Sequence, residues 1–104
     1  MVSVTVKKQG GEFSRIEIFG HALFDDTGKD IVCAGVSALT FNMLNSVEVF
    51  TEDSLKVNIA EGITIDFPEV VSKETKLLTD SLLLGLSGIE HRYKDNISID
   101  FLED

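Results

Sequence analysis

Hydrophobic and polar residues alternate one by one along five short stretches of the chain, and this alternation predicts β-strands with one buried face each. The five stretches cover residues 2–7, 14–19, 55–59, 63–67 and 96–102. Gly10 and Gly11 follow the first stretch, and two glycines supply the positive φ that a hairpin turn needs. Glu61 and Gly62 form the turn between the third and fourth stretches. We therefore expect two hairpins and a single final strand.

In two longer stretches the hydrophobic residues recur every three or four positions, which predicts helices with one apolar stripe each. We expect Asp30 to cap a helix that runs to about Phe50, and Ser72 to cap a second helix over residues 73–93. The predicted stripes consist of Val36, Leu39, Met43, Val47 and Phe50 in the first helix and of Leu78, Leu82, Leu86, Ile89 and Tyr93 in the second.

The resulting element order is β-β-α-β-β-α-β within a single domain, residues 1–104. Every strand alternates, whereas a sheet that is covered on both sides has continuously apolar strands. We therefore predict an α+β fold, a two-layer sandwich in which two helices cover one face of a five-stranded, mostly antiparallel sheet.

The chain carries 18 acidic and 9 basic residues, a formal net charge of −9 at pH 7. Phosphate binding depends on Lys and Arg, so this charge argues against nucleic acid as a direct partner. It suits a basic protein partner, although solubility alone also explains it. No apolar run approaches the roughly 20 residues of a membrane span, and the N-terminus does not resemble a signal peptide. Together with a single cysteine, these features favour a cytoplasmic chain without membrane contact.

Cys33 and His21 are the side chains best suited to catalysis. A thiolate can attack a carbonyl carbon while a nearby imidazole takes and returns the proton. We expect Cys33 in the first turn of its helix, where the dipole and unpaired N–H groups favour negative charge. The amides of Cys33 and Ala34 would then be available to bind an oxyanion. Each side chain also has a plainer interpretation, because a free cysteine is commonly a small buried hydrophobe and a lone histidine is commonly structural.

Other polar residues have secondary roles in this hypothesis. Asp30 would orient His21 as the third group of a triad, or act only as a helix cap. Ser37 lies one turn after Cys33 on the same helical face, either beside the site or as a packing residue. His91, near the end of the second helix, is expected to be structural. His21 and Cys33 alone do not supply the three or four ligands of a metal site, and no phosphate-binding glycine motif is present, so no metal or cofactor is expected.

Two segments around these residues form a motif, Gly20-His21-Ala22 and Gly28-Lys29-Asp30-Ile31-Val32-Cys33-Ala34-Gly35-Val36-Ser37-Ala38. This motif resembles that of the ribosomal-processing cysteine protease family of Gram-positive-type bacteria, called Prp. The resemblance implies a Cys–His endopeptidase with Cys33 as nucleophile, His21 as base and Asp30 at the acidic position. It also implies a mobile loop over residues 22–29, which includes Ala22, Gly28 and Lys29; residues 23–27 carry no transferable roles.

The resemblance further implies a substrate and an assembly. Members of the family remove a short N-terminal extension from large-subunit ribosomal protein twenty-seven, a step needed for ribosome assembly, and they are typically homodimers. The expected partner is therefore a ribosomal protein precursor that carries such a leader. Two alternatives stay open. One is a non-catalytic, acidic, ribosome-associated binding module with Cys33 in its core. The other is a redox sensor, for which the chain has no resolving cysteine.

Overall fold

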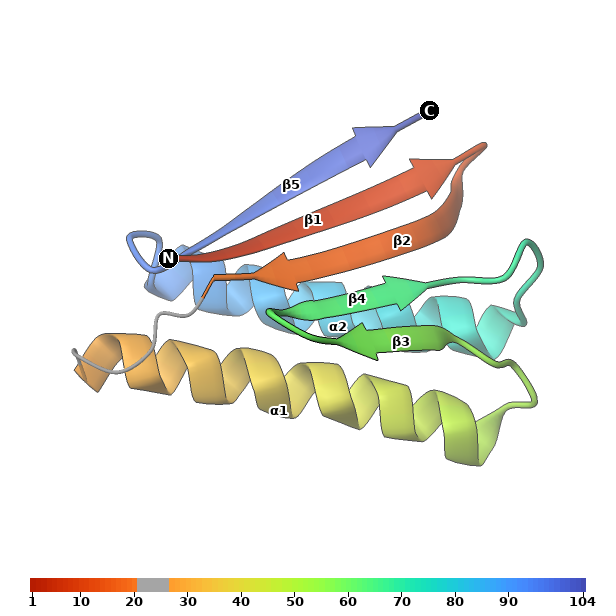
Figure 1. The fold of residues 1–104 in the computed structure, drawn as a ribbon, viewed down its shortest axis with the longest axis horizontal. Helices are drawn as coiled ribbons and strands as arrows, with labels where there is room; N and C mark the ends of the chain where they lie inside the picture. Colours follow the sequence, from red (N-terminus) through yellow and green to blue (C-terminus); the bar gives the residue numbers. More distant parts are fainter. Residues whose placement is uncertain (21–26) are drawn as a thin grey trace.

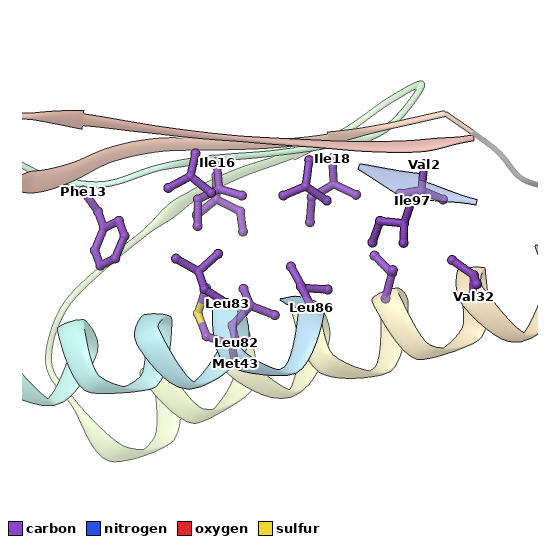
Figure 2. Close-up of a cluster of buried hydrophobic side chains, with 14 of the residues drawn as sticks. Val2, Phe13, Ile16, Ile18, Val32, Met43, Leu82, Leu83, Leu86 and Ile97 are labelled. Atoms are coloured by element: carbon purple, nitrogen blue, oxygen red, sulfur yellow. The ribbon is translucent and has the colours of Figure 1, made fainter. Parts of the chain in front are cut away.

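The computed structural model describes residues 1–20 and 27–104 (Figure 1). All seven predicted elements are present in the predicted order. They are β1 (Val2–Gln9), β2 (Glu12–Phe19), α1 (Thr27–Phe50), β3 (Lys56–Ile59), β4 (Ile63–Asp66), α2 (Lys73–Arg92) and β5 (Ile97–Glu103). The predicted α+β class is confirmed. Figure 2 shows the strands on one side of the core side chains and the helices on the other.

The five strands form one mixed sheet in the order β3-β4-β2-β1-β5. The pairs β1–β2, β2–β4 and β3–β4 are antiparallel, whereas β1 and β5 are parallel. The parallel pair arises because α2 carries the chain back across the face of the sheet before β5 begins. The sheet is therefore mostly antiparallel, as predicted, and its two edge strands are β3 and β5.

One predicted turn and one predicted helix cap are confirmed in detail. Gly10 and Gly11, between β1 and β2, have φ angles of 60° and 82°. At the start of α2, the hydroxyl of Ser72 accepts a hydrogen bond from the Thr75 N–H at 3.2 Å, the geometry of an N-cap.

Asp53 ties the loop after α1 to this cap. Its carboxylate accepts hydrogen bonds from the Ser72 N–H at 3.0 Å, from the Ser72 hydroxyl at 2.6 Å and from the Thr75 hydroxyl. These bonds, the one from the Ser72 hydroxyl foremost, lower the pKa of Asp53 below its ordinary value. The ionised form of Asp53 thus helps to hold the beginning of α2.

The core lies between the sheet and the two helices (Figure 2). Its fully buried large side chains include Ile16, Ile65, Leu86 and Ile97, and α1 contributes Val32, Val36, Met43 and Val47. The predicted helix stripes therefore face the sheet along most of their length.

Four apolar side chains that were predicted to face the core are exposed instead. Phe50 is 73% exposed, Val57 and Ile59 on β3 are 39% and 61% exposed, and Phe101 on β5 is 60% exposed. Each lies at a margin of the contact between the layers: the last residue of α1, an edge strand, and the far end of the other edge strand (Figure 1). Hydrophobic periodicity indicates which way a side chain faces, but not where the opposite layer ends.

The start of α1 also differs from the prediction. The helix begins at Thr27, so residues 27–29 are helical rather than part of a loop, and Asp30 is not the N-cap. Capping preference did not single out the start, because Asp25, Asp26 and Thr27 are also capping residue types.

α1 is more apolar as a whole than its short apolar runs suggest. Over Ile31–Phe50 its mean hydropathy is 1.2, enough by length and composition to cross a membrane. The expectation that the chain has no such stretch is wrong, because it counted uninterrupted runs and α1 interleaves apolar residues with Ser, Thr and Asn. Part of this apolarity serves the core, where Val32, Val36 and Met43 pack against the sheet.

Candidate active site

A hollow of about 120 Å³ lies between α1 and one end of the sheet. Four segments meet around it: the start of β1, the end of β2, two turns of α1, and the turn between β3 and β4. Its mostly apolar lining includes Ile18, Gly20, Cys33, Val36, Ser37 and Gly62.

Cys33 is half-buried in the wall of this hollow. On one side it packs against the hydrophobic core, and on the other it borders open space. A cysteine that served only as a core hydrophobe would be enclosed, so this position favours the catalytic interpretation. Ser37, one turn later on α1, is exposed and lines the same hollow, as its spacing predicted.

The environment of the Cys33 backbone differs from the prediction. Cys33 and Ala34 are the seventh and eighth residues of α1, not part of its first turn. At such positions an α-helix gives each N–H an acceptor four residues earlier, and the effect of the dipole fades beyond the first turn. The expectation of free amides at a helix start is therefore wrong, and an oxyanion role for the Cys33 and Ala34 amides loses its physical basis. The Ala34 side chain is exposed.

Two glycines allow the segments around the hollow to approach closely. Gly20 has a φ of +91°, and a Cβ on it would lie 2.1 Å from the carbonyl oxygen of Met1. A Cβ on Gly62 would lie 2.4 Å from the carbonyl oxygen of Ile18. Only glycine fits such contacts between backbones. The sequence marked Gly20 through its motif, but it marked Gly62 only as a turn residue, because its contact with β2 depends on strand order.

His21 follows Gly20 directly in the sequence, so β2 leads the chain to the hollow immediately before the predicted base. His21 and Ala22 lie outside the described residues, as do the side chains of residues 27–30, among them Lys29 and Asp30. The pairing of His21 with Cys33 and the role of Asp30 therefore stay predictions.

In the part of the chain that the structure describes, His91 and the acidic residues do not form a second centre. His91 lies in the last turn of α2, where a cation suits the helix dipole, as predicted. Within residues 1–20 and 27–104, no three His, Cys, Asp or Glu side chains are grouped closely enough to hold a metal ion.

Comparison with known proteins assigns the chain to a family of cysteine proteases. Residues 1–98 match the family model described as cysteine protease Prp. The ribosomal processing cysteine protease Prp of Bacillus subtilis (strain 168) is 32% identical over an alignment of 107 positions that covers 95% of this chain and 96% of the relative. The chain belongs to the Prp family of cysteine proteases.

Solved structures agree with this assignment. A structure of an essential ribosomal processing protease Prp from Staphylococcus aureus, in complex with a substrate peptide, superposes with a TM-score of 0.90 at 26% identity and covers 97% of this chain and 99% of its own. A protein from Streptococcus mutans superposes with a TM-score of 0.92 at 25% identity and covers 100% of this chain and 96% of its own.

Proposed function

We propose that this chain is a cysteine endopeptidase that removes the N-terminal extension of large-subunit ribosomal protein twenty-seven. The observation that carries the proposal is the accessible thiol of Cys33, in the wall of a hollow to which β2 leads the chain just before His21. Relatives named for ribosomal processing support the substrate class, and so does the Staphylococcus aureus structure with its substrate peptide. The net charge of −9 favours the approach of a basic ribosomal protein.

The reaction then proceeds in two steps, acylation and deacylation. His21 takes the proton of the Cys33 thiol, and Sγ attacks the carbonyl carbon of the scissile bond. The C–N bond breaks as the imidazolium gives that proton to the leaving amine, and the leader remains on Sγ as a thioester. His21 next takes a proton from water, the resulting hydroxide attacks the thioester, and the released Sγ recovers a proton from the imidazolium. Asp30 acts as a positioning residue for His21, and neither step needs a cofactor.

The cytoplasm suits this activity, because ribosomal proteins are assembled there and a single catalytic thiol stays reduced.

The experiment that tests the function mixes the purified chain with the leader-bearing precursor and reads the products by mass spectrometry. The wild type is expected to cut at the leader junction, and Cys33→Ala to leave the precursor intact while keeping its fold. Ser46→Ala is the matched control, since it also removes one heteroatom from α1 but away from the hollow. Iodoacetamide is a second probe, because Cys33 is the only thiol.

Two results would contradict the proposal. Equal cleavage by the wild type and Cys33→Ala would exclude the thiol as nucleophile. An uncut precursor together with slow alkylation of Cys33 would favour the alternative, a non-catalytic acidic binding module.

We further propose that the chain forms a homodimer through the face of α1 that points away from the sheet. The exposed residues there recur every three or four positions, and none is charged; they are Ile31, Ala34, Ala38, Phe41, Asn45 and Val49. Two copies that each carry −9 repel one another, so a face without charge is where they can meet. Such spacing is typical of paired helices, and an Asn within the row helps to fix their register.

Light scattering after size exclusion tests the dimer. The wild type is expected to have the mass of two chains, and Phe41→Glu that of one. Phe101→Glu is the matched control, because Phe101 is 60% exposed on β5 and lies off this face. A monomeric wild type, or a dimeric Phe41→Glu, would overturn the proposed interface.

A further inference from the structure

In the described part of the chain, β3 is an edge strand of the sheet with no neighbour on its outer side. Among residues 1–20 and 27–104, β3 pairs with β4 alone (Figure 1). An unpaired edge presents a row of N–H and C=O groups, which is a template for another chain. The free edge of β3 is therefore a surface that can bind an extended peptide.

The register of the β3–β4 hairpin shows which backbone groups face this edge. The amide of Ala60 donates to the carbonyl of Gly62 at 3.1 Å, just beyond the last pair of the ladder. This places Ile59 in a pair that exchanges no hydrogen bonds, and Val57, two residues earlier, has the same status. The N–H and C=O groups of Val57 and Ile59 thus point to the free edge, whereas those of Asn58 point toward β4.

The side chains of the same two residues are exposed on the helix side of the sheet. Val57 and Ile59 pair with Ile65 and Ile63, so they share the sheet face that carries the core. Even so, they are 39% and 61% exposed. α1 does not cover this part of the sheet, and an apolar strip remains open beside the free edge.

Two hollows flank this strip on the α1 side, one at the turn after β3 and one at the start of β3; the two hollows and the strip between them are together called the groove. The first hollow, of about 120 Å³, contains Cys33 and Ser37; the second, of about 290 Å³ at the other end of β3, contains Leu44, Glu48 and Val57. The four α1 residues recur at multiples of about one turn, so they lie along one side of the helix. From Cys33 to Glu48 the groove spans about 22 Å, the length of about seven extended residues.

We propose that the chain to be cleaved binds in this groove as a sixth strand beside β3, with its scissile bond at Cys33. The proposal rests on the proposed function and states how that substrate is held. Hydrogen bonds to the backbone of Val57 and Ile59 bind the peptide whatever its sequence, and alternate side chains point onto α1. The sequence preference of the site is set by the peptide side chain that enters the apolar hollow beside Cys33. A bound strand would also cover the strip that Val57 and Ile59 leave open.

The far end of the groove has a definite charge preference. Glu48 and Asp53 line the second hollow, and none of its described lining residues is basic. Ser72 and Thr75 hold the Asp53 carboxylate in its ionised form. A basic side chain or a terminal amine of the peptide is therefore favoured about seven residues from the scissile bond.

Ile59→Pro tests the proposed strand pairing. Proline removes the N–H that points to the free edge but no hydrogen bond to β4, so the fold should survive, as for other edge positions. Ile59→Ala is the matched control, because it removes the side chain and keeps the N–H. The probe is a fluorescent peptide that spans the leader junction of ribosomal protein twenty-seven. We expect it to bind Ile59→Pro at least tenfold more weakly than Ile59→Ala, both in a Cys33→Ala background, and kcat/KM to fall in parallel when Cys33 is present.

The outcomes distinguish failure of the proposed peptide-binding groove from failure of the proposed protease function. Equal binding by the two Ile59 variants overturns the groove even if the wild type cleaves the leader. Loss of binding in Ile59→Pro without cleavage by the wild type supports the groove and contradicts the protease function. A peptide that does not bind Cys33→Ala at all overturns both.

A scan of the peptide backbone keeps the proposal falsifiable if Ile59→Pro does not fold. Peptides with a single N-methyl group at successive positions should lose binding at every second position, because only alternate amides face β3. Uniform tolerance, or uniform loss, would overturn the strand pairing.

Discussion

Gly20→Ala is expected to destabilise the fold by about 2–4 kcal/mol. L-Alanine at a φ of +91° costs roughly 1–2 kcal/mol. The new Cβ would also lie 2.1 Å from the Met1 carbonyl oxygen. That oxygen cannot retreat alone, because its peptide group includes the Val2 N–H, which donates to the Asn96 carbonyl at 2.8 Å. Loss of this hydrogen bond adds about 0.5–1.5 kcal/mol, and the shift of the buried Val2 side chain accounts for the rest.

Urea unfolding followed by circular dichroism measures this cost directly. Gly88→Ala is the matched control, since it makes the same chemical change within α2, where a Cβ would meet nothing within 4 Å. The control should be stabilised by about 0.4–1 kcal/mol, because alanine is the better helix former and restricts the unfolded chain. The two variants should therefore move the unfolding midpoint in opposite directions.

Activity provides the second readout for Gly20→Ala. Gly20 borders the hollow of Cys33 and directly precedes His21, so a displaced backbone there should lower leader cleavage even at temperatures where the variant is folded. A variant that unfolds within 0.5 kcal/mol of the wild type, a margin below the cost of the strained φ alone, would refute the reasoning. In that case the close approach of Gly20 to Met1 would not contribute to the stability of this end of the sheet.

The remaining predictions concern one residue each. His21→Ala should lower single-turnover cleavage by about 10²–10⁴-fold, the usual contribution of general acid–base catalysis, and a loss under threefold would exclude it as the base. Asp30→Asn should reduce cleavage less than the loss of Cys33 or His21 and leave the melting temperature unchanged; unchanged cleavage as well would leave Asp30 no part in the site. Ser72→Ala should cost about 1 kcal/mol in urea unfolding through loss of the N-cap, and no loss would show that water replaces the cap. Asp53→Asn should be less stable than the wild type at neutral pH. Since the folded-state pKa of Asp53 lies below its unfolded value, its contribution is present above that unfolded value and is lost as pH falls through the folded one. The two stabilities should therefore converge in strong acid, and a gap that does not change with pH would mean that the charge is irrelevant.

Features governed by neighbours in the sequence could be predicted from the sequence. The positive φ angles of Gly10 and Gly11 and the Ser72 cap depend on contacts within a few residues. The alternation of β1 is equally local, and both Val4 and Val6 are fully buried as predicted. In each case the residue type suits the backbone conformation or the buried face at its own position, so neighbouring residues are enough to predict it.

Features that depend on distant segments could not be predicted. The sheet order places β4 beside β2 and pairs Ile18 with Ile63, which brings Gly62 against the end of β2. No local pattern encodes this neighbour. For the same reason the sequence indicated which way Ile59 faces but not that α1 fails to cover it.

The position of the Cys33 thiol in α1 bears directly on how its reactivity can be explained. The sequence placed Cys33 at a helix start, where the helix itself would favour the thiolate, but α1 begins six residues earlier. Since the dipole acts mainly within the first turn, enhanced reactivity of Cys33 has to come from a neighbouring side chain. His21 is the candidate, because it directly follows Gly20 in the sequence and Gly20 lines the same hollow. Alkylation of Cys33 in His21→Ala should therefore be as slow as that of an ordinary free thiol. If alkylation by iodoacetamide at pH 7 is equally fast in the wild type and His21→Ala, a group other than His21 activates the nucleophile.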